Sequence, residues 1–320
     1  MVESSSPLPK SLESLEGHGL CRISVNNIVQ TVLVEDTTEP FYVGILDPRR
    51  LNETKERKWQ PLGGAIRLTD TGRRMMELVG GEMLGPKGSK ESGDARFSIP
   101  TEKFVEVMNF FSRLRPAVFE DSATREIFEE LSEKEFDAHP PILSHAEASR
   151  ITSVTHGVLH DLPKYEGASG RFSKDMPFAR VTYLSSITMP KDVFDKLRLC
   201  PLIHIFSKEE ASRIVEMRMQ GQNPRTDGGD ELATTMMLQS KIPPVVASSD
   251  SLYLYEKNAE LECAVFIALG EAIKGGRTDL EEILKKVVLA DGSKVDITEE
   301  QIQMILNKEV PRIRALVDHV

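Results

Sequence analysis

Three carboxylates and one guanidinium are concentrated at residues 125–130, which read Arg-Glu-Ile-Phe-Glu-Glu. Apolar residues recur every four positions around them and predict an amphipathic helix. This stripe comprises Phe119, Ala123, Ile127 and Leu131. Glu126, Glu129 and Glu130 fall on the opposite side of the helix. Glu126 and Glu130 lie one turn apart, with roughly 5–6 Å between their Cβ atoms. Like charges at this spacing destabilise a helix unless they are neutralised. A hard divalent cation such as Mg²⁺, which prefers carboxylate, water and phosphate oxygens, would neutralise them.

The same pattern has a simpler interpretation as a solvated acidic face, because the chain carries a formal net charge of -10 at pH 7. A glycine pair upstream favours the metal site instead. Gly63 and Gly64 follow an extended apolar segment at 41–46, and adjacent glycines are typical of a tight turn. The acidic helix is therefore expected to belong to a larger arrangement.

Together, these segments resemble the Nudix hydrolase superfamily. In that family a strand ends in a Gly-Gly turn, a loop follows, and a helix carries Arg-Glu-aliphatic-x-Glu-Glu. Residues 125–130 match each defined position of this motif, and the helix that carries them is called the box helix below. The resemblance implies an α/β (α+β) fold, a Nudix-type α/β/α sandwich around a mixed sheet. A long insertion would precede the box helix, and a helical extension would follow the domain.

The chain departs from the family pattern at three places. A long insertion at about residues 66–115 separates the glycine pair from the box helix, and Ala117 stands where the family has a loop glutamate. Leu131-Ser132-Glu133 replaces the usual x-Gly-aliphatic after the box. The insertion includes residues 94–100, Asp-Ala-Arg-Phe-Ser-Ile-Pro, ahead of an apolar helical stretch. This layout resembles the SMODS-associated Nudix subgroup, which accompanies nucleotide second-messenger synthetases in bacterial antiviral defence.

The resemblance implies Mg²⁺-dependent hydrolysis of a nucleoside diphosphate linked to another moiety, by attack of water at phosphorus, and Mn²⁺ could replace Mg²⁺. A cation that bridges pyrophosphate oxygens neutralises their charge and lowers the pKa of a bound water. Glu129 and Glu130 are the implied main metal ligands, joined by the main-chain carbonyl of Gly64. Glu126 is implied as a ligand or as the general base. Arg125 would hold one carboxylate by a bidentate pair, or else form a surface salt bridge of little energetic weight.

Three further residues are candidates for substrate contacts. Gly63 belongs to the predicted turn. Trp59 could stack on a base, although a lone tryptophan beside a strand is more often a core residue. Glu166, in the loop at 164–174, could supply a further acid to the site.

Composition limits the ligand and the compartment. Hydrophobic residues make up 40% of the 320 residues, which is typical of a globular protein. The sequence pI near 5.4 argues against a broad basic surface for duplex nucleic acid, whereas a local cation can still capture a small nucleotide. The three cysteines are widely spaced and indicate a reducing compartment. No stretch resembles a membrane span or a secretory leader, so we expect a cytoplasmic protein that does not bind membranes.

Hydrophobic patterning predicts the domain organisation. We expect a mobile tail at 1–19, a Nudix-like domain at 20–220, a linker and connecting segment at 221–255, and a helical C-terminal region at 256–320. Within the domain, strands are predicted at 22–25, 28–34, 41–46, 151–160, 178–187 and 202–206, and helices at 69–79 and 101–115. Apolar stripes along the C-terminal helices would pack on the domain or on a second copy of it. A homodimer through these helices is therefore one prediction.

Two other classes of function are compatible with these residues. The first is a sensor, in which the scaffold binds a nucleotide or second messenger without turning it over, as the missing loop glutamate would permit. The second is a protein-interaction module, in which the insertion and the C-terminal helices dock a partner and the acidic helix is merely solvated.

Overall fold

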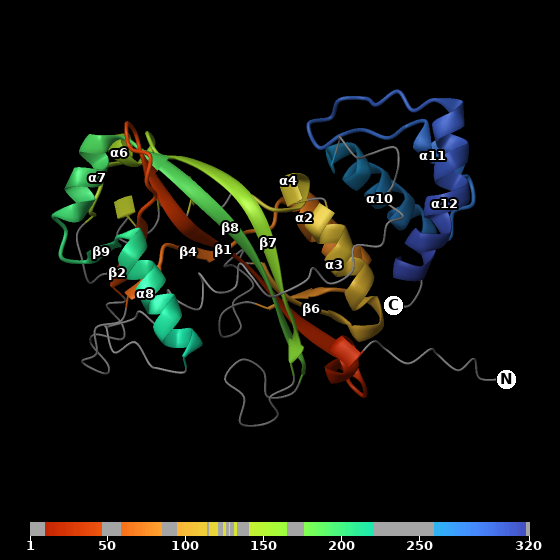
Figure 1. Cartoon of the computed structure of the whole chain (residues 1–320). Coiled ribbons are helices and arrows are strands. Elements are labelled where there is room, and N and C mark those ends of the chain that lie inside the picture. The colour runs from red at the N-terminus through yellow and green to blue at the C-terminus, as the bar shows by residue number, and fades with distance from the viewer. Residues whose placement is uncertain are drawn as a thin grey trace.

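A long twisted sheet runs through the middle of the molecule, with a group of helices towards each end (Figure 1). The computed structural model describes residues 10–46, 59–84, 95–113, 115–120, 124, 125, 128, 131, 132, 141–164, 176–220 and 259–317. The strands of the main sheet lie in the order β5-β6-β1-β8-β7, and β4 also pairs with β1.

The main sheet is mixed, as the sequence predicted. β1 runs parallel to β8, and its pairings with β4 and β6 are antiparallel, as are those of β8 with β7 and of β5 with β6. The strands are β1 (Leu20–Val34), β4 (Gly63–Ala65), β5 (Glu82–Met83), β6 (Arg96–Pro100), β7 (Thr152–Lys164) and β8 (Phe178–Met189). The two strands predicted at 22–34 are one strand, whose pairing with β8 shifts register between Val29 and Thr31. A β-bulge of this kind bends a strand without ending it.

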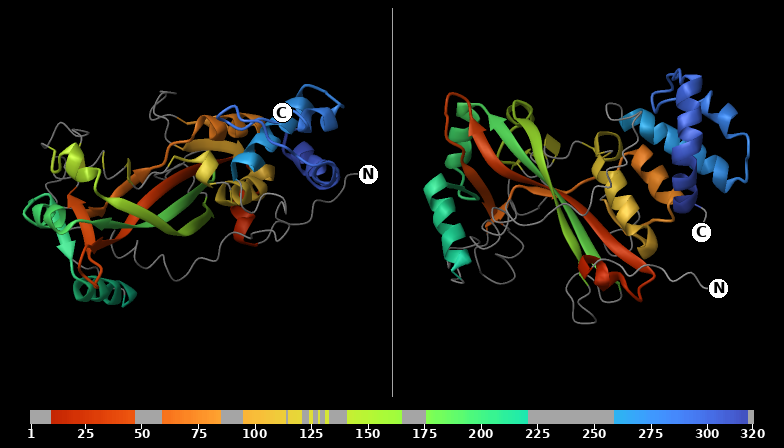
Figure 2. Two further views of the ribbon diagram at one scale, coloured as in Figure 1. Left: turned by 90° about the horizontal axis from the view of Figure 1, so that it is seen from above. Right: turned by 45° about the vertical axis from the view of Figure 1, so that its right-hand side comes forward.

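A second, antiparallel sheet lies beside one end of the main sheet, with its strands in the order β3-β2-β9. Its strands are β2 (Tyr42–Leu46), β3 (Trp59–Pro61) and β9 (Ile203–Phe206). Three helices lie at the same end of the molecule (Figure 2), namely α6 (His145–Ala148), α7 (Lys191–Arg198) and α8 (Lys208–Met219). Side chains from both sheets and from α7 form one buried cluster, here called the second core.

The first core fills the same face of the main sheet further towards the start of β1. Alternate residues of β1 point into it, because successive side chains of a strand face opposite ways. They are Cys21, Ile23 and Val25. The helices that cover this core are α2 (Asp70–Leu78), α3 (Phe104–Arg113) and α4 (Arg115–Val118). Most of the predicted insertion therefore supplies helices and two strands, β5 and β6, to the body of the fold.

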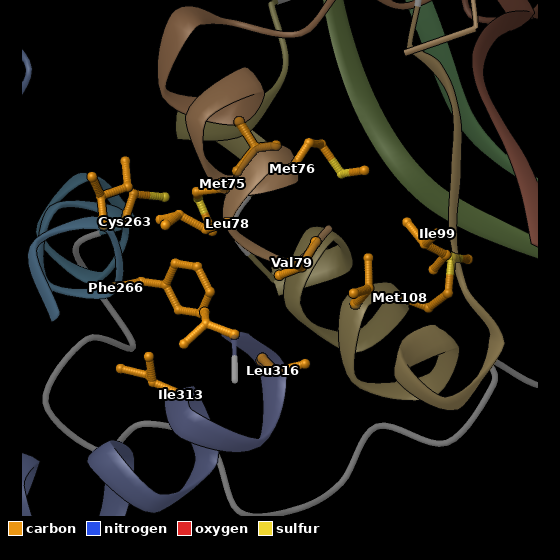
Figure 3. Close-up of a cluster of buried hydrophobic side chains, with 14 of the residues drawn as sticks. Met75, Met76, Leu78, Val79, Ile99, Met108, Cys263, Phe266, Ile313 and Leu316 are labelled. Carbon is orange, nitrogen blue, oxygen red and sulfur yellow. The ribbon is translucent and has the colours of Figure 1, made fainter. Parts of the chain in front are cut away.

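The three C-terminal helices extend the first core, and the first of them packs on α2. They are α10 (Ala259–Lys274), α11 (Leu280–Leu284) and α12 (Glu299–Val317). Figure 3 shows Leu78 of α2, Phe266 of α10 and Leu316 of α12 in one cluster of buried side chains. At Gly270, an added Cβ would lie 3.1 Å from the Leu78 Cδ1 atom, so α10 approaches α2 closely. The apolar stripes predicted for these helices are thus largely covered within the chain.

Residues 10–19 differ from the mobile tail that the sequence predicted. Lys10–Leu15 forms a 3₁₀ helix, η1, and both Leu12 and Leu15 are buried in the first core. The three-residue spacing places these leucines on the same side of a 3₁₀ turn. This short helix was not predicted, because its two leucines stand among polar residues.

The apolar stripe predicted for the box helix is wrong at Phe119. This residue forms an antiparallel bridge with Leu68 and is buried in the first core. Leu131, by contrast, is buried in the second core. Phe119 therefore belongs to an extended segment between α4 and the box helix, while Ala123 and Ile127 lie outside the described residues.

Side-chain caps fix the N-terminal ends of α8 and α12. The Ser207 and Thr298 hydroxyls accept from the main-chain N–H groups of Glu210 and Gln301, whose side chains accept in return. These reciprocal bonds satisfy amide groups that have no partner inside a helix. No helix in the part of the chain that the structure describes is long and apolar enough to cross a membrane.

Candidate functional site

The glycine pair lies in β4, a short strand paired with β1 and called the glycine strand below, and not in the tight turn that the sequence predicted. Gly63 pairs with Ile28, and Gly64 pairs with Asn27. The Gly63 φ angle is 137°, a conformation that favours glycine. A Cβ atom at this position would lie 2.2 Å from the Asn27 carbonyl oxygen. A side chain therefore cannot be added here without moving β4 away from β1.

The main-chain carbonyls of β4 alternate in direction. On either side of the Asn27–Gly64 pair, the Val29 N–H donates to the Leu62 carbonyl and the Ile66 N–H donates to the Val25 carbonyl. In an antiparallel ladder every second residue bonds to the same neighbouring strand. The Gly64 carbonyl is therefore directed at β1, and the carbonyls of Gly63 and Ala65 are directed away from it.

Arg125 joins the box helix to this strand. Its guanidinium Nη2 donates to the Ala65 main-chain carbonyl over 2.7 Å, and its Nε lies 3.8 Å from a Glu120 carboxylate oxygen. The Arg125 side chain is 16% exposed, so the hydrogen bond is largely shielded from water. The structure thus brings together the start of the box helix and the glycine strand, which the long insertion separates in sequence.

Three other residues of the box helix, Thr124, Phe128 and Leu131, contact neighbouring segments and share one face of the helix. The Thr124 and Ser153 hydroxyls lie 3.0 Å apart, and the Phe128 ring packs edge-on against the His145 ring. Further along, the Leu131 carbonyl accepts from the N–H groups of Ile142 and Leu143, each at 2.8 Å. The Ser132 hydroxyl donates to the Phe128 carbonyl. Positions 124, 128, 131 and 132 recur at three- and four-residue spacing, which places them on one side of a helix.

The helix that carries His145 is itself fixed by charge. Ser144 caps α6 in a reciprocal arrangement with Glu147, and the Lys196 ammonium of α7 donates to the Glu147 carboxylate over 2.7 Å. The Lys196 hydrogen bond, followed by those from Ser144, lowers the pKa of Glu147 to about 2. The carboxylate is therefore ionised at neutral pH and holds α6 between the box helix and α7.

A row of polar side chains lies on the sheet beneath the start of the box helix. The Asn27 amide Nδ2 of β1 donates to the Ser185 hydroxyl of β8 over 3.0 Å, and this hydroxyl lies 2.9 Å from that of Thr155 on β7. The side chains of Asn27 and Ser185 are fully buried. This row was not predicted from the sequence. Its sign in the sequence is Asn27, a polar residue in the apolar alternation of β1 between Val25 and Val29.

The acids predicted as metal ligands lie outside the described residues, and so does the predicted loop acid. These residues are Glu126, Glu129, Glu130 and Glu166. The Trp59 main chain belongs to β3, but its side chain is not described. Among the described residues there is no group of three or more His, Cys, Asp or Glu side chains that could hold a metal ion. The individual roles predicted for these residues therefore stay predictions.

Comparison with known proteins decides the family. Residues 51–197 match the family model of the SMODS-associated NUDIX domain. The chain carries a SMODS-associated NUDIX domain. The match includes the glycine strand and the whole box, so both resemblances stated from the sequence are confirmed. No curated protein and no solved structure matches the chain.

The structural unit around this NUDIX domain is larger than the matched range. β1 lies before residue 51 and is the central partner of β4, β6 and β8. β9 lies after residue 197 and completes the second sheet. The scaffold that positions the glycine strand and the box helix therefore depends on segments on both sides of the matched range.

We predict that Gly63→Ala lowers the free energy of unfolding by about 2 kcal/mol or more, because it combines a strained φ angle with a clash against Asn27. Gly19→Ala is the matched control, since a Cβ atom at Gly19 would meet nothing within 4 Å. Urea denaturation of both variants measures the difference. Equal stabilities would contradict the close approach of β4 to β1.

We predict that Arg125→Ala lowers the free energy of unfolding by about 1–3 kcal/mol, because it leaves the Ala65 carbonyl without its charged donor. The control is Arg74→Ala, which removes an ion pair with Glu271 whose two side chains are 56% and 51% exposed. Exposed pairs of this kind contribute up to about 1 kcal/mol. If the Arg74 variant loses more stability than the Arg125 variant in thermal or urea unfolding, the anchoring role of Arg125 is wrong.

Proposed function

We propose that this NUDIX domain is a Mg²⁺-dependent pyrophosphohydrolase that acts on a nucleoside diphosphate linked to another moiety. The observation that carries the proposal is the hydrogen bond from Arg125 to the Ala65 carbonyl. It brings the first residue of the acidic motif to the residue that follows the glycine pair. The other acids of the motif lie within five residues of Arg125 in sequence.

The donor set fits a hard divalent cation. Glu126, Glu129 and Glu130 would supply carboxylate oxygens from the box helix, and β4 would supply a main-chain carbonyl. The resemblance to the family implied the Gly64 carbonyl for this role. We propose Gly63 in its place, because the pairing of β4 with β1 directs the Gly64 carbonyl at β1 and the Gly63 carbonyl to the side where Arg125 meets Ala65.

In the proposed reaction, the bound cation supplies charge neutralisation of the pyrophosphate and a water of lowered pKa. Glu129 and Glu130 hold the cation. Glu126 is a further ligand or accepts the proton of the attacking water. Arg125 fixes the start of the box helix on β4, which would keep these carboxylates at a constant distance from the Gly63 carbonyl. Gly63, Trp59 and Glu166 would contact the substrate.

A nucleotide sensor is the second candidate, and the surroundings of Ala117 favour it. The family has its loop glutamate at this position. In this chain the position is Ala117, which lies in α4 and packs against the first core. The Ala117 carbonyl accepts from the Thr69 hydroxyl over 2.7 Å. This position is committed to the body of the fold and offers no acid to the site. A scaffold that has lost one acid could bind a nucleotide second messenger of antiviral defence with little or no turnover.

Several properties of the protein belong to the same proposal. The ligand is a small nucleotide and not duplex nucleic acid, and the protein acts in the cytoplasm. A homodimer through the C-terminal helices stays a prediction. The apolar stripes that suggested it are largely covered by α2 and by one another, so any dimer would use other surfaces of these helices.

We predict that the protein, incubated with Mg²⁺ and a panel of nucleoside diphosphate derivatives, releases nucleoside monophosphate. Glu129→Gln and Glu130→Gln should each lower kcat/KM by at least about a hundredfold, because they remove metal ligands while keeping side-chain size. Glu299→Gln is the matched control, since Glu299 lies in the first turn of α12 with its side chain 65% exposed. Its kcat/KM should equal that of the wild type.

The outcomes separate the candidate functions. Turnover that survives both glutamine substitutions would contradict the proposed site. Thermal stabilisation by nucleotide and Mg²⁺ without turnover would favour the sensor. An absence of any metal or nucleotide effect would favour the interaction module.

A further inference from the structure

Three arginines lie on the face of the main sheet that points away from the first core. They are Arg22 of β1, Arg96 of β6 and Arg180 of β8, and all three are half-buried. The two sequence neighbours of each arginine are buried in the first core. Because successive side chains of a strand point to opposite faces, the three arginine side chains leave the sheet on the side that α2, α3 and α4 do not cover.

The pairing register brings these arginines together. Ser24 of β1 is the register partner of both Arg96 and Arg180, so these two arginines lie one strand to either side of it. Arg22 lies two residues along β1 from Ser24 and on the same face. Adjacent strands lie roughly 4.8 Å apart. Long side chains on three consecutive strands therefore reach a common space above Ser24.

The Phe178 ring holds two of the guanidinium groups near each other. The Cζ atoms of Arg22 and Arg180 lie 5.8 Å and 5.7 Å from the centroid of this ring, within the range of a cation–π contact. Burial of the Arg22 guanidinium, followed by repulsion from Arg96, lowers the pKa of Arg22. Like charges gathered at half-buried positions favour the binding of an anion among them.

Acids stand at the margins of the arginine group. Glu82 of β5 is the register partner of Ser98, which in turn pairs with Arg22. On the other side, Asp161 of β7 is the register partner of Arg180. β5 and β7 are the outer strands of the order β5-β6-β1-β8-β7, and the arginines belong to its three inner strands. Positive charge is therefore concentrated at the centre of this face, although the chain carries a formal net charge of -10.

The arginine group is separate from the box helix. The Thr124 hydroxyl contacts that of Ser153 on β7, whose side chain shares a face with Thr155, two residues further along the strand. Thr155 belongs to the polar row that ends at Asn27, and Asn27 is on the same face of β1 as the residues of the two cores. The start of the box helix and the arginine group thus lie on opposite faces of the sheet.

We propose that Arg22, Arg96 and Arg180 form a second anion site, which binds a chain of two or more linked phosphates, either as an inorganic polyphosphate or as part of a nucleotide. A guanidinium fork matches the oxygens of a phosphate group. Several guanidiniums in one space favour a ligand with several linked phosphates over a single phosphate. The site uses no metal, and the inference is independent of the proposed hydrolase function.

The experiment is calorimetric titration of the full-length protein, in chelator, with tripolyphosphate, with ATP and with orthophosphate. We expect tripolyphosphate and ATP to bind at least about tenfold more tightly than orthophosphate, because each added charge-assisted hydrogen bond increases affinity. The affinity should fall as the salt concentration rises. ATP and tripolyphosphate of equal affinity would indicate that the site recognises phosphates alone, whereas tighter binding of ATP would indicate that it also contacts the nucleoside; both results support the site.

Substitutions of the arginines test whether they form the site. Arg22→Gln, Arg96→Gln and Arg180→Gln should each weaken tripolyphosphate binding about tenfold, because each removes a charged donor. Lysine at the same positions keeps the charge but loses the planar fork, so its effect should be smaller. If a glutamine variant does not fold, the lysine variant at that position carries the test. Arg277→Gln is the matched control, since Arg277 forms an exposed ion pair with Asp279 and should leave the affinity unchanged.

Two results would overturn the proposal. One is a wild-type protein that binds neither tripolyphosphate nor ATP in chelator. The other is a set of arginine variants that all bind tripolyphosphate as tightly as the Arg277→Gln control. Neither result bears on the proposed hydrolase, which requires a divalent cation. Conversely, a failure of Mg²⁺-dependent turnover would leave the anion site in place, because its binding is measured without metal.

Discussion

The hydrogen bond between the Arg125 guanidinium and the Ala65 carbonyl is the contact on which the candidate site depends. It joins two segments that a long insertion separates in sequence, and its burial makes it stronger than the same bond would be in water. A second hydrogen bond, between Thr124 and Ser153, fixes the helix to β7, at the other end of the strand order β4-β1-β8-β7. With both ends of this span attached, the start of the box helix has one position across β1 and β8.

The insertion and the C-terminal helices build the apolar core that supports β4. α2, α3 and α4 cover the first core, α10 packs on α2, and α12 packs on α10. β4 leads directly into this layer, because the Ile66 N–H bonds to Val25 and Leu68 pairs with Phe119. The glycine strand is therefore held at one end by a large apolar core, while the second core holds the far end of the box helix through Leu131.

Much of this fold could be predicted from the sequence, because alternation and helical spacing report directly on which residues face a core. The strands predicted at 151–160 and 178–187 and the helix predicted at 69–79 are confirmed as β7, β8 and α2. Other features depend on contacts between distant segments and have no local signal. The burial of η1 requires a core elsewhere in the chain, and Phe119 has the spacing of a helix but pairs with Leu68 as a strand. Likewise, the motif predicted the glycine pair and Arg125 as site residues, but the direction of the carbonyls depends on the register with β1. The polar row of Asn27, Ser185 and Thr155 also depends on which residues of three strands lie side by side.

The central claim is that the box acids and the glycine strand share one divalent cation. A crystal of the protein soaked in Mn²⁺, with diffraction data collected to reveal anomalous scattering, tests it most directly. We predict an anomalous peak between the box helix and β4, within coordination distance of Glu129, Glu130 and the Gly63 carbonyl. A peak bound only elsewhere on the surface, or electron density that turns these carboxylates away from β4, would contradict it.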